Sequence, residues 1–272
     1  MDDVPLTRDL VFDVGLHKGE DSAYYLAKGF RVVGVEASSE LAKETANRLR
    51  AAVDDARLTI ENVAIADKSG PVTFYLSANS VWGTTNPEWA ERYEHQGYER
   101  TTVTVEGVTF SDLIARHGVP YFLKVDIEGA DILCLRALLD VPDRPKYVSI
   151  ESEKVRWSSL VDEFNLLERL GYHQFKIVPQ HKVDKQVQPS PPREGKYAAG
   201  HAFNYGASGL FGEEAPGRWL TKAQALALYR AVFLRYRLIG DSGVLHKVRL
   251  ASGAVYQIIR EPGWYDTHAR LG

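Results

Sequence analysis

The sequence has little sulfur, with one cysteine and one methionine among 272 residues. A single cysteine excludes any disulfide within the chain, and the apolar surroundings of Cys134 (ILCLRALL) predict a buried side chain rather than a nucleophile. No apolar run approaches the roughly 20 residues that a membrane-spanning helix needs. The first residues, MDDVPLTRDL, lack the basic-then-apolar pattern of a signal peptide. We therefore expect a soluble, cytoplasmic protein without a membrane span.

Charge of either sign is not in large excess. The formal net charge is -3 at pH 7, and the pI is about 6.3. This balance gives no electrostatic case for nucleic acid or an anionic membrane as the main partner. The eight histidines include no pair at the spacing typical of zinc ligands.

Short apolar runs alternate with helical stretches through the first 180 residues. The runs at 9–15, 31–36, 58–65, 121–126, 146–151 and 172–178 predict buried strands. Helices are expected at 20–29, 39–54, 110–117, 129–140 and 158–171, and more exposed strands at 72–77 and 101–106. This alternation predicts an α/β fold of the Rossmann-like type, with a mainly parallel central sheet and helices on both faces.

The regular alternation of strand-like and helical segments ends after residue 180. A proline-rich loop is expected at 186–197, a helix at 221–237, and two short strand-like runs within 244–268. We interpret residues 1–180 as a cofactor-binding domain and residues 181–272 as a C-terminal extension. The extension is expected to be either an acceptor-binding cap or a packed lobe of the same domain.

A glycine-containing loop follows the first expected strand. Gly15 permits a sharp turn, Gly19 permits close approach of a ligand, and the next helix offers free N–H groups. Glu36 ends the second strand, where a carboxylate can bind ribose hydroxyls. Together these features predict a cofactor with an adenosine group. Asp13 in the turn would repel a pyrophosphate and suits a cationic sulfonium, which favours S-adenosylmethionine over NAD(P).

Four motifs occur in a recognisable order: D-V-G-x-x-x-G from Asp13, V-x-V-E ending at Glu36, N-x-A-x-x-D-x-x-G from Asn62, and L-K-x-D-x-E-G-A-D around Asp126. In this order the chain resembles the FkbM family of S-adenosylmethionine-dependent O-methyltransferases, and its tail resembles an extended branch of that family. The resemblance implies a class I methyltransferase fold. Many members have Ala-Asn after D-V-G, where this chain has Leu-His-Lys.

The resemblance also implies a set of cofactor-binding residues. Asp13, Gly15 and Gly19 would hold the methionine end, Glu36 the ribose, and Asn62 and Val63 the adenine. The full candidate set is Asp13, Gly15, His17, Lys18, Gly19, Glu36, Ala37, Asn62, Val63, Asp67, Ser80 and Asp126.

Acidic residues follow two of the expected core strands, which places them at one edge of the sheet. They are Asp126, Glu128, Glu151 and Glu153. A hydroxyl is a weak nucleophile until its proton begins to leave, so a general base assists methylation. Asp126 is the first candidate base and His17 the second. The alternative is a structural role, in which Asp126 and Glu128 form salt bridges or cap a helix. Asp126, Glu151 and Glu153 also suit a weakly held Mg²⁺, although we expect no tightly bound metal.

Aromatic residues beside polar ones are candidates for acceptor binding, because apolar sugar faces stack on rings. They are Trp82, His201, Tyr205 and Trp264; packing of an irregular lobe explains them equally well. We expect an enzyme that transfers a methyl group to a hydroxyl of a sugar, a saccharide precursor or a natural product. The alternatives are an NAD(P)-dependent oxidoreductase or epimerase, and a cofactor-binding module without activity.

Overall fold

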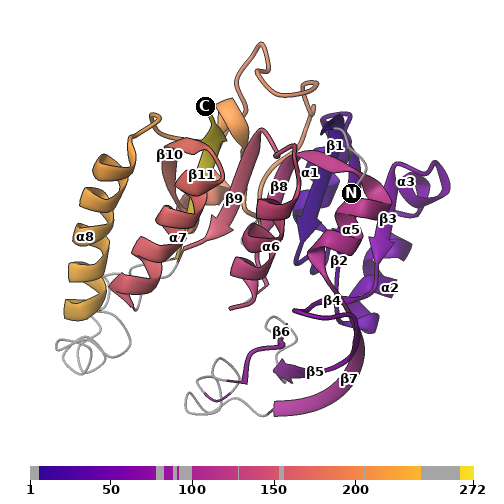
Figure 1. Cartoon of the computed structure of the whole chain (residues 1–272). Coiled ribbons are helices and arrows are strands. Elements are labelled where there is room, and N and C mark those ends of the chain that lie inside the picture. The colour runs from indigo at the N-terminus through magenta and orange to yellow at the C-terminus, as the bar shows by residue number, and fades with distance from the viewer. Residues whose placement is uncertain are drawn as a thin grey trace, which may run out of the picture.

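Seven strands form the central sheet in the order β10-β11-β9-β8-β1-β2-β3 (Figure 1). The computed structural model describes residues 6–77, 83–87, 91, 100–127, 129–152, 156–204, 206–239 and 264–272. The strands of this sheet are β1 (Leu6–Val14), β2 (Arg31–Val35), β3 (Leu58–Glu61), β8 (Val119–Val125), β9 (Tyr147–Glu151), β10 (Tyr172–Pro179) and β11 (Tyr265–Leu271). β11 runs antiparallel to both of its neighbours, β9 and β10, and the other neighbouring pairs are parallel. The expected Rossmann-like α/β fold is confirmed.

Helices cover both faces of this sheet. They are α1 (Glu20–Ala27), α2 (Ser39–Arg48), α3 (Arg50–Asp54), α5 (Phe110–His117), α6 (Asp131–Ala137), α7 (Trp157–Arg169) and α8 (Lys222–Ile239). On one face, α5, α6, α7 and α8 enclose an apolar core that includes Phe110, the buried Cys134 and Phe164. On the other face, α1 and the C-terminal extension pack against the sheet through Tyr25 and Phe211.

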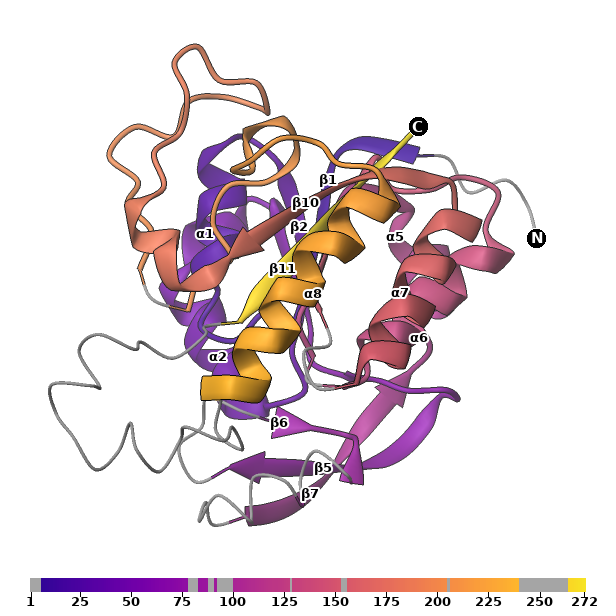
Figure 2. The same ribbon diagram turned by 90° about the vertical axis from the view of Figure 1, so that its left-hand side faces the viewer.

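A second sheet of four strands projects from the first in the order β4-β7-β5-β6 (Figure 2). It consists of β4 (Ala64–Ile65), β5 (Gly70–Ser77), β6 (Gly83–Thr84) and β7 (Arg100–Val108). Two predictions need correction here. The single strand expected at 58–65 divides at Asn62, because β3 and β4 belong to different sheets. The single helix expected at 39–54 divides at Leu49, where the backbone leaves the helical region with φ -104° and ψ 26°.

The C-terminal extension reaches the core of the molecule. It contains the short 3₁₀ helices Gln180–Lys185 and Gly212–Glu214, then α8, and then β11, which lies inside the central sheet. The ammonium of Lys28, just after the end of α1, and the Glu214 carboxylate form an ion pair 2.8 Å long, with both side chains fully buried. Most of the strand-like runs expected within 244–268 lie outside the described residues, and β11 is the described part of that region. No helix among the described residues is long and apolar enough to cross a membrane.

Candidate functional site

The loop between β1 and α1 lies at the switch point of the sheet, where strand order proceeds in opposite directions from β1. Open α/β sheets bind ligands at such a point, outside the carboxyl ends of the strands. Gly15 has φ +90°, and a Cβ there would stand 1.9 Å from the Asp126 backbone oxygen. Gly19 has φ +72°, and a Cβ there would stand 2.6 Å from the Thr45 side chain. Glycine is therefore required at both positions, because the backbone is left-handed there and a Cβ atom would clash with its neighbours.

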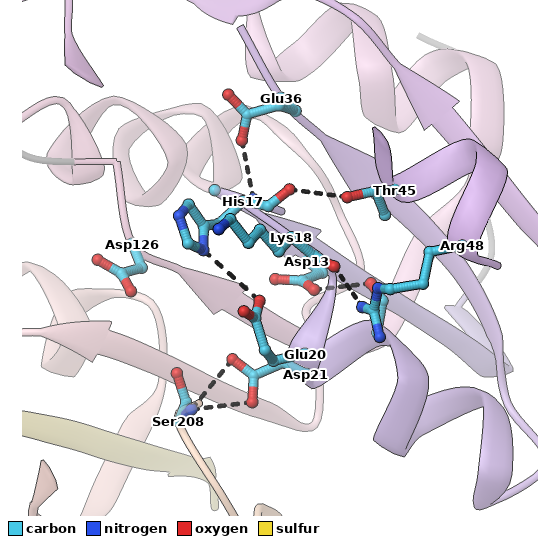
Figure 3. Close-up of polar contacts among 12 residues, drawn as sticks. Asp13, His17, Lys18, Glu20, Asp21, Glu36, Thr45, Arg48, Asp126 and Ser208 are labelled. Carbon is cyan, nitrogen blue, oxygen red and sulfur yellow. Dashed lines mark hydrogen bonds and ion pairs between the residues drawn. The ribbon is translucent and has the colours of Figure 1, made fainter. Parts of the chain in front are cut away.

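His17 and Glu36 are joined across this loop (Figure 3). The Glu36 carboxylate accepts hydrogen bonds from the backbone N–H of His17 and of Ser38, each 2.8 Å long. Burial raises the pKa of Glu36. His17 has an unusual φ of 50°, and its buried Nε2 has no hydrogen-bond partner among the described residues. Glu36 is thus held in place, and its carboxylate oxygens can accept further hydrogen bonds. The ring of His17 presents a nitrogen that has no partner among the described residues.

Lys124 lies at the centre of a buried cluster beneath the loop. Its ammonium lies 3.1 Å from Asp13 Oδ1 and 3.7 Å from Asp126 Oδ2, and it donates to the Gly15 carbonyl oxygen at 2.9 Å. Asp13 is fully buried and also accepts a hydrogen bond from the Ser22 hydroxyl. Burial would lower the pKa of Lys124, but the charges of the neighbouring aspartates outweigh it and raise that pKa. A permanent cation therefore fixes the loop to β8.

Asp21, at the start of α1, joins the same cluster and binds the C-terminal extension. Its two carboxylate oxygens lie 2.8 and 3.0 Å from the backbone nitrogen of Ser208, which donates to them (Figure 3). Burial raises the pKa of Asp21 to about 7, with Lys124 opposing the shift and Asp13 adding to it. The extension thus lies beside the loop that the sequence predicts to bind the cofactor.

Polar side chains cross the sheet in two adjacent rows on the face covered by α1. The strand registers place Asp13, Lys124, Ser149, His268 and Lys176 in one row on five neighbouring strands. The same registers place Glu151 opposite Asp266, and Asp126 directly follows Val125, which pairs with Ile150. Because side chains alternate between the two faces of a sheet, both rows point to one side.

Two residues of β11 contribute to these rows. Burial raises the pKa of Asp266 well above its usual range, and the nearby charges of Asp126 and Glu151 add to that effect. Burial lowers the pKa of His268 to about 3. The His268 ring is therefore neutral at neutral pH, and burial favours the protonated form of Asp266.

Two of the other predicted cofactor residues, Asn62 and Val63, follow the end of β3. The Asn62 side chain donates hydrogen bonds to the carbonyl oxygens of Glu36 and Ala37, and it accepts one from the Ser39 hydroxyl. Val63 is buried. Lys18 and Asp67 are exposed, Lys18 in the loop and Asp67 in the turn before β5. Asn62 thus fastens the two strand ends to each other.

The predicted catalytic and acceptor-binding residues do not form one cluster among the described residues. The Asp126 side chain is 41% exposed beside the loop, and Glu151 ends the neighbouring strand. His201 packs against the rings of Tyr24 and Phe203, and Trp264 precedes β11. The remaining predictions lie outside the described residues: Ser80, Trp82, Glu128, Glu153 and Tyr205. Within the described part of the chain, no three His, Cys, Asp or Glu side chains form a group that could hold a metal ion.

Comparison with known proteins gives the family. The family model described as Methyltransferase FkbM domain matches residues 13–173, which is more than half of the chain. The chain belongs to this family. It is a methyltransferase, and its cofactor is S-adenosylmethionine. The matched region contains the glycine loop, Glu36, Asn62 and Asp126, and it ends before β11.

Solved methyltransferase structures resemble the chain weakly. A methyltransferase from Thiobacillus denitrificans in complex with S-adenosylhomocysteine has 10% identity over 98% of this chain and 86% of that chain, with a TM-score of 0.37. A putative sarcosine dimethylglycine methyltransferase from Galdieria sulphuraria has 8% identity over 99% and 79%, with a TM-score of 0.41. A precorrin-6y C5,15-methyltransferase from Geobacter metallireducens has 10% identity over 64% and 69%, with a TM-score of 0.35. No curated protein matches the chain.

The described residues fit the cofactor. The backbone at Gly15 and Gly19 leaves no room for a side chain, the Glu36 carboxylate is fixed by two N–H groups, and His17 Nε2 is buried without a partner. Fixed polar groups at a glycine loop are what a charged amino-acid end and a ribose need.

The predicted site residues include Trp264 but not the nearby Asp266, and they include neither Lys124 nor Asp21 of the buried cluster. Lys124 had a readable signal, because it stands two residues before Asp126 and therefore on the same face of the strand. Asp21 has no such signal, because its partner Ser208 lies 187 positions away in the sequence. Asp266 depends on a strand insertion that no local pattern reveals.

Proposed function

We propose that this methyltransferase acts on oxygen, and that its acceptor is a hydroxyl of a sugar, a saccharide precursor or a related natural product. The observation that carries the proposal is the position of Asp126. Its carboxylate follows β8, stands beside the glycine loop and is half-exposed, while Lys124 holds it from behind at 3.7 Å. A carboxylate so placed can accept the proton of a hydroxyl.

The division of labour in this proposal follows from the geometry. Bound S-adenosylmethionine supplies a methyl group attached to a cationic sulfur. Gly15, Gly19 and Glu36 position that cofactor, Asp126 accepts the hydroxyl proton, and Lys124 keeps Asp126 aligned with the loop. Orientation matters because the acceptor oxygen must lie in line with the bond that breaks.

The acceptor class is supported by the resemblance to the FkbM family and by the groups near Asp126. The carboxyl groups of Asp266 and Glu151, which face each other on β11 and β9, can hydrogen-bond to sugar hydroxyls, and Trp264 lies just before β11. We also propose that residues 181–272 are a lobe of the same domain, because β11 pairs with β9 and β10 and Glu214 pairs with Lys28 in the interior.

The first experiment is calorimetric titration with S-adenosylhomocysteine and, in parallel, with NAD(P)H. We expect binding of the former alone. Labelled S-adenosylmethionine is then supplied with a panel of glycosides, with catechols and amines as acceptors of other classes. Binding of NAD(P)H alone would favour the alternative of an NAD(P)-dependent oxidoreductase. Methyl transfer only to amines would exclude the proposed O-methylation.

The Asp126→Asn variant tests the base. We expect it to keep measurable binding of S-adenosylhomocysteine, because asparagine is polar and similar in size, and to lose about 100-fold in turnover, a typical contribution of a general base. Asp140→Asn, at an exposed position after α6, is the matched control and is expected to retain full turnover. Unchanged turnover in Asp126→Asn would show that Asp126 is not the base.

A further inference from the structure

Helix α8 is basic although the chain as a whole is slightly acidic. The segment 215–239 contains Arg218, Lys222, Arg230, Arg235 and Arg237 and no aspartate or glutamate. The whole chain carries a net charge of -3. Lys222 pairs with Glu168 on α7 at 2.8 Å, so the local excess of positive charge comes from the arginines. Helix α8 itself lies at the outer edge of the molecule, beyond α7 and β10 (Figure 1).

One face of α8 anchors it to the core. Ala225 and Tyr229 are buried, and Tyr229 packs against the ring of Phe164 on α7. Further along the helix, the Phe233 ring packs edge-on against Trp157, with ring centroids 5.2 Å apart. The helix is therefore held in one orientation, and its opposite face is fixed toward the outside.

The opposite face of α8 is apolar although it is exposed. Ala227, Ala231, Leu234 and Leu238 follow one another at spacings of four, three and four residues, which places them in one stripe along the helix. Leu234 is 59% exposed and Leu238 is 43% exposed. A solvated helix face normally consists of polar residues. On α8 the arginines stand beside the stripe, with Arg230 and Arg237 on one side and Arg235 on the other.

A groove continues the apolar stripe toward the start of the helix. It has a volume of about 400 Å³ and is lined by apolar side chains, including Ile177, Leu220 and Leu228. Arg218 stands in its lining, and Leu228 is 51% exposed. Exposed apolar surface that continues into a groove, with cations at its rim, marks an interaction surface.

We propose that α8 is a peripheral docking surface for an anionic phospholipid membrane. Leu234 and Leu238 would enter the boundary between headgroups and acyl chains, and the flanking arginines would contact lipid phosphates. An apolar stripe bordered by cations is the arrangement that lies in a membrane interface without crossing it.

The charge of α8 argues against a second copy of the chain on this face. Two α8 helices placed side by side, in either direction, would bring arginines near arginines, and neither helix offers a carboxylate to pair with them. An anionic lipid surface attracts arginines without requiring a matching sequence.

The position of α8 gives such docking a consequence for the site. The contact between Phe233 and Trp157 places the second half of α8 beside the start of α7. α7 is the next helix after β9, which ends at Glu151 on the edge of the sheet that carries Asp126. The half of the docking surface that carries Leu234 and Leu238 thus lies at the same end of the molecule as the sheet edge with Asp126.

Flotation of the full chain with lipid vesicles tests the proposal. Vesicles of phosphatidylcholine alone are compared with vesicles that contain phosphatidylglycerol as the anionic lipid. We expect binding to the anionic vesicles at low salt, with loss of binding at high salt because exposed charges are screened. Leu234→Glu and Arg237→Glu should each reduce the bound fraction about tenfold.

Two control variants make this result specific. Val187→Glu alters an apolar side chain that is 80% exposed on the extension, and Arg169→Glu reverses an exposed charge at the end of α7. Both should bind vesicles as the unaltered chain does, and circular dichroism confirms the fold of every variant. No flotation with anionic vesicles, or equal loss in all four variants, would overturn the proposal. A dimer that dissociates in Leu234→Glu would also overturn it, in favour of a second copy on this face.

Discussion

At the scale of single residues, the cofactor loop depends on positions where a side chain cannot fit. The backbone at Gly15 is both left-handed and pressed against the carbonyl of Asp126. The second condition is the stricter one, because a left-handed residue costs only about 1–2 kcal/mol, whereas a contact at 1.9 Å must be relieved by moving the loop away from β8.

Gly15→Ala is therefore expected to abolish measurable binding of S-adenosylhomocysteine and to lower the midpoint of thermal unfolding. The control is Gly217→Ala, because Gly217 has the same φ of +90° and a Cβ there would meet nothing within 4 Å. It should cost about 1 kcal/mol from backbone strain alone and leave binding intact. Calorimetry measures the first effect and urea unfolding the second; normal affinity in Gly15→Ala would contradict the close approach.

Asp21 predicts a pH dependence of stability. Its pKa is about 7 in the folded protein against 3.8 for the free side chain, so the folded state holds a proton that the unfolded state has lost across this interval. Stability then falls as pH rises from about 4 to 7, by at most roughly 1.4 kcal/mol per pH unit for one proton.

Asp21→Asn removes this titrating group and keeps one oxygen to accept the Ser208 N–H. Urea unfolding between pH 4 and 7 should show a shallower decline than in the unaltered protein. Asp140→Asn, at an exposed position, should reproduce the original profile. An unchanged slope in Asp21→Asn would assign the proton to another member of the buried cluster.

At the scale of elements, α1 is clamped between the sheet and the extension. Its first turn binds Ser208 through Asp21, and Lys28 just after its end binds Glu214. Glu214 also accepts hydrogen bonds from the backbone N–H groups of Arg193 and Glu194. One carboxylate thus joins three segments that are far apart in the chain.

Lys28→Met should lower the free energy of unfolding by about 3 kcal/mol, because it leaves the Glu214 charge buried without a cation. Arg31→Met is the matched control: its partner is Asp9, the two side chains are 49% and 61% exposed, and the expected loss is below about 1 kcal/mol. Restoring neutrality in the double variant Lys28→Met with Glu214→Gln should recover part of the loss. An equal loss of unfolding free energy in Lys28→Met and Arg31→Met would show that burial does not determine how much an ion pair stabilises this protein.

At the scale of the whole molecule, sequence patterns predicted the features that neighbouring residues encode. They missed the features that depend on contacts between distant residues. The glycine loop and the acids after strands are visible because each is encoded within a few neighbouring residues, as with Asp13 to Gly19. The breaks at Leu49 and Asn62 were missed because apolar spacing continues across them. The contact of Ser208 with Asp21 joins residues 187 positions apart, and no periodicity records such a pairing.

The insertion of β11 between β9 and β10 has a consequence for synthesis on the ribosome. β9 and β10 emerge long before β11, and until β11 arrives each presents an unpaired edge to its surroundings. Open strand edges readily pair with other chains. The nascent protein therefore passes through a stage in which its central sheet is incomplete at that position, and the open edges of β9 and β10 can then pair with other chains.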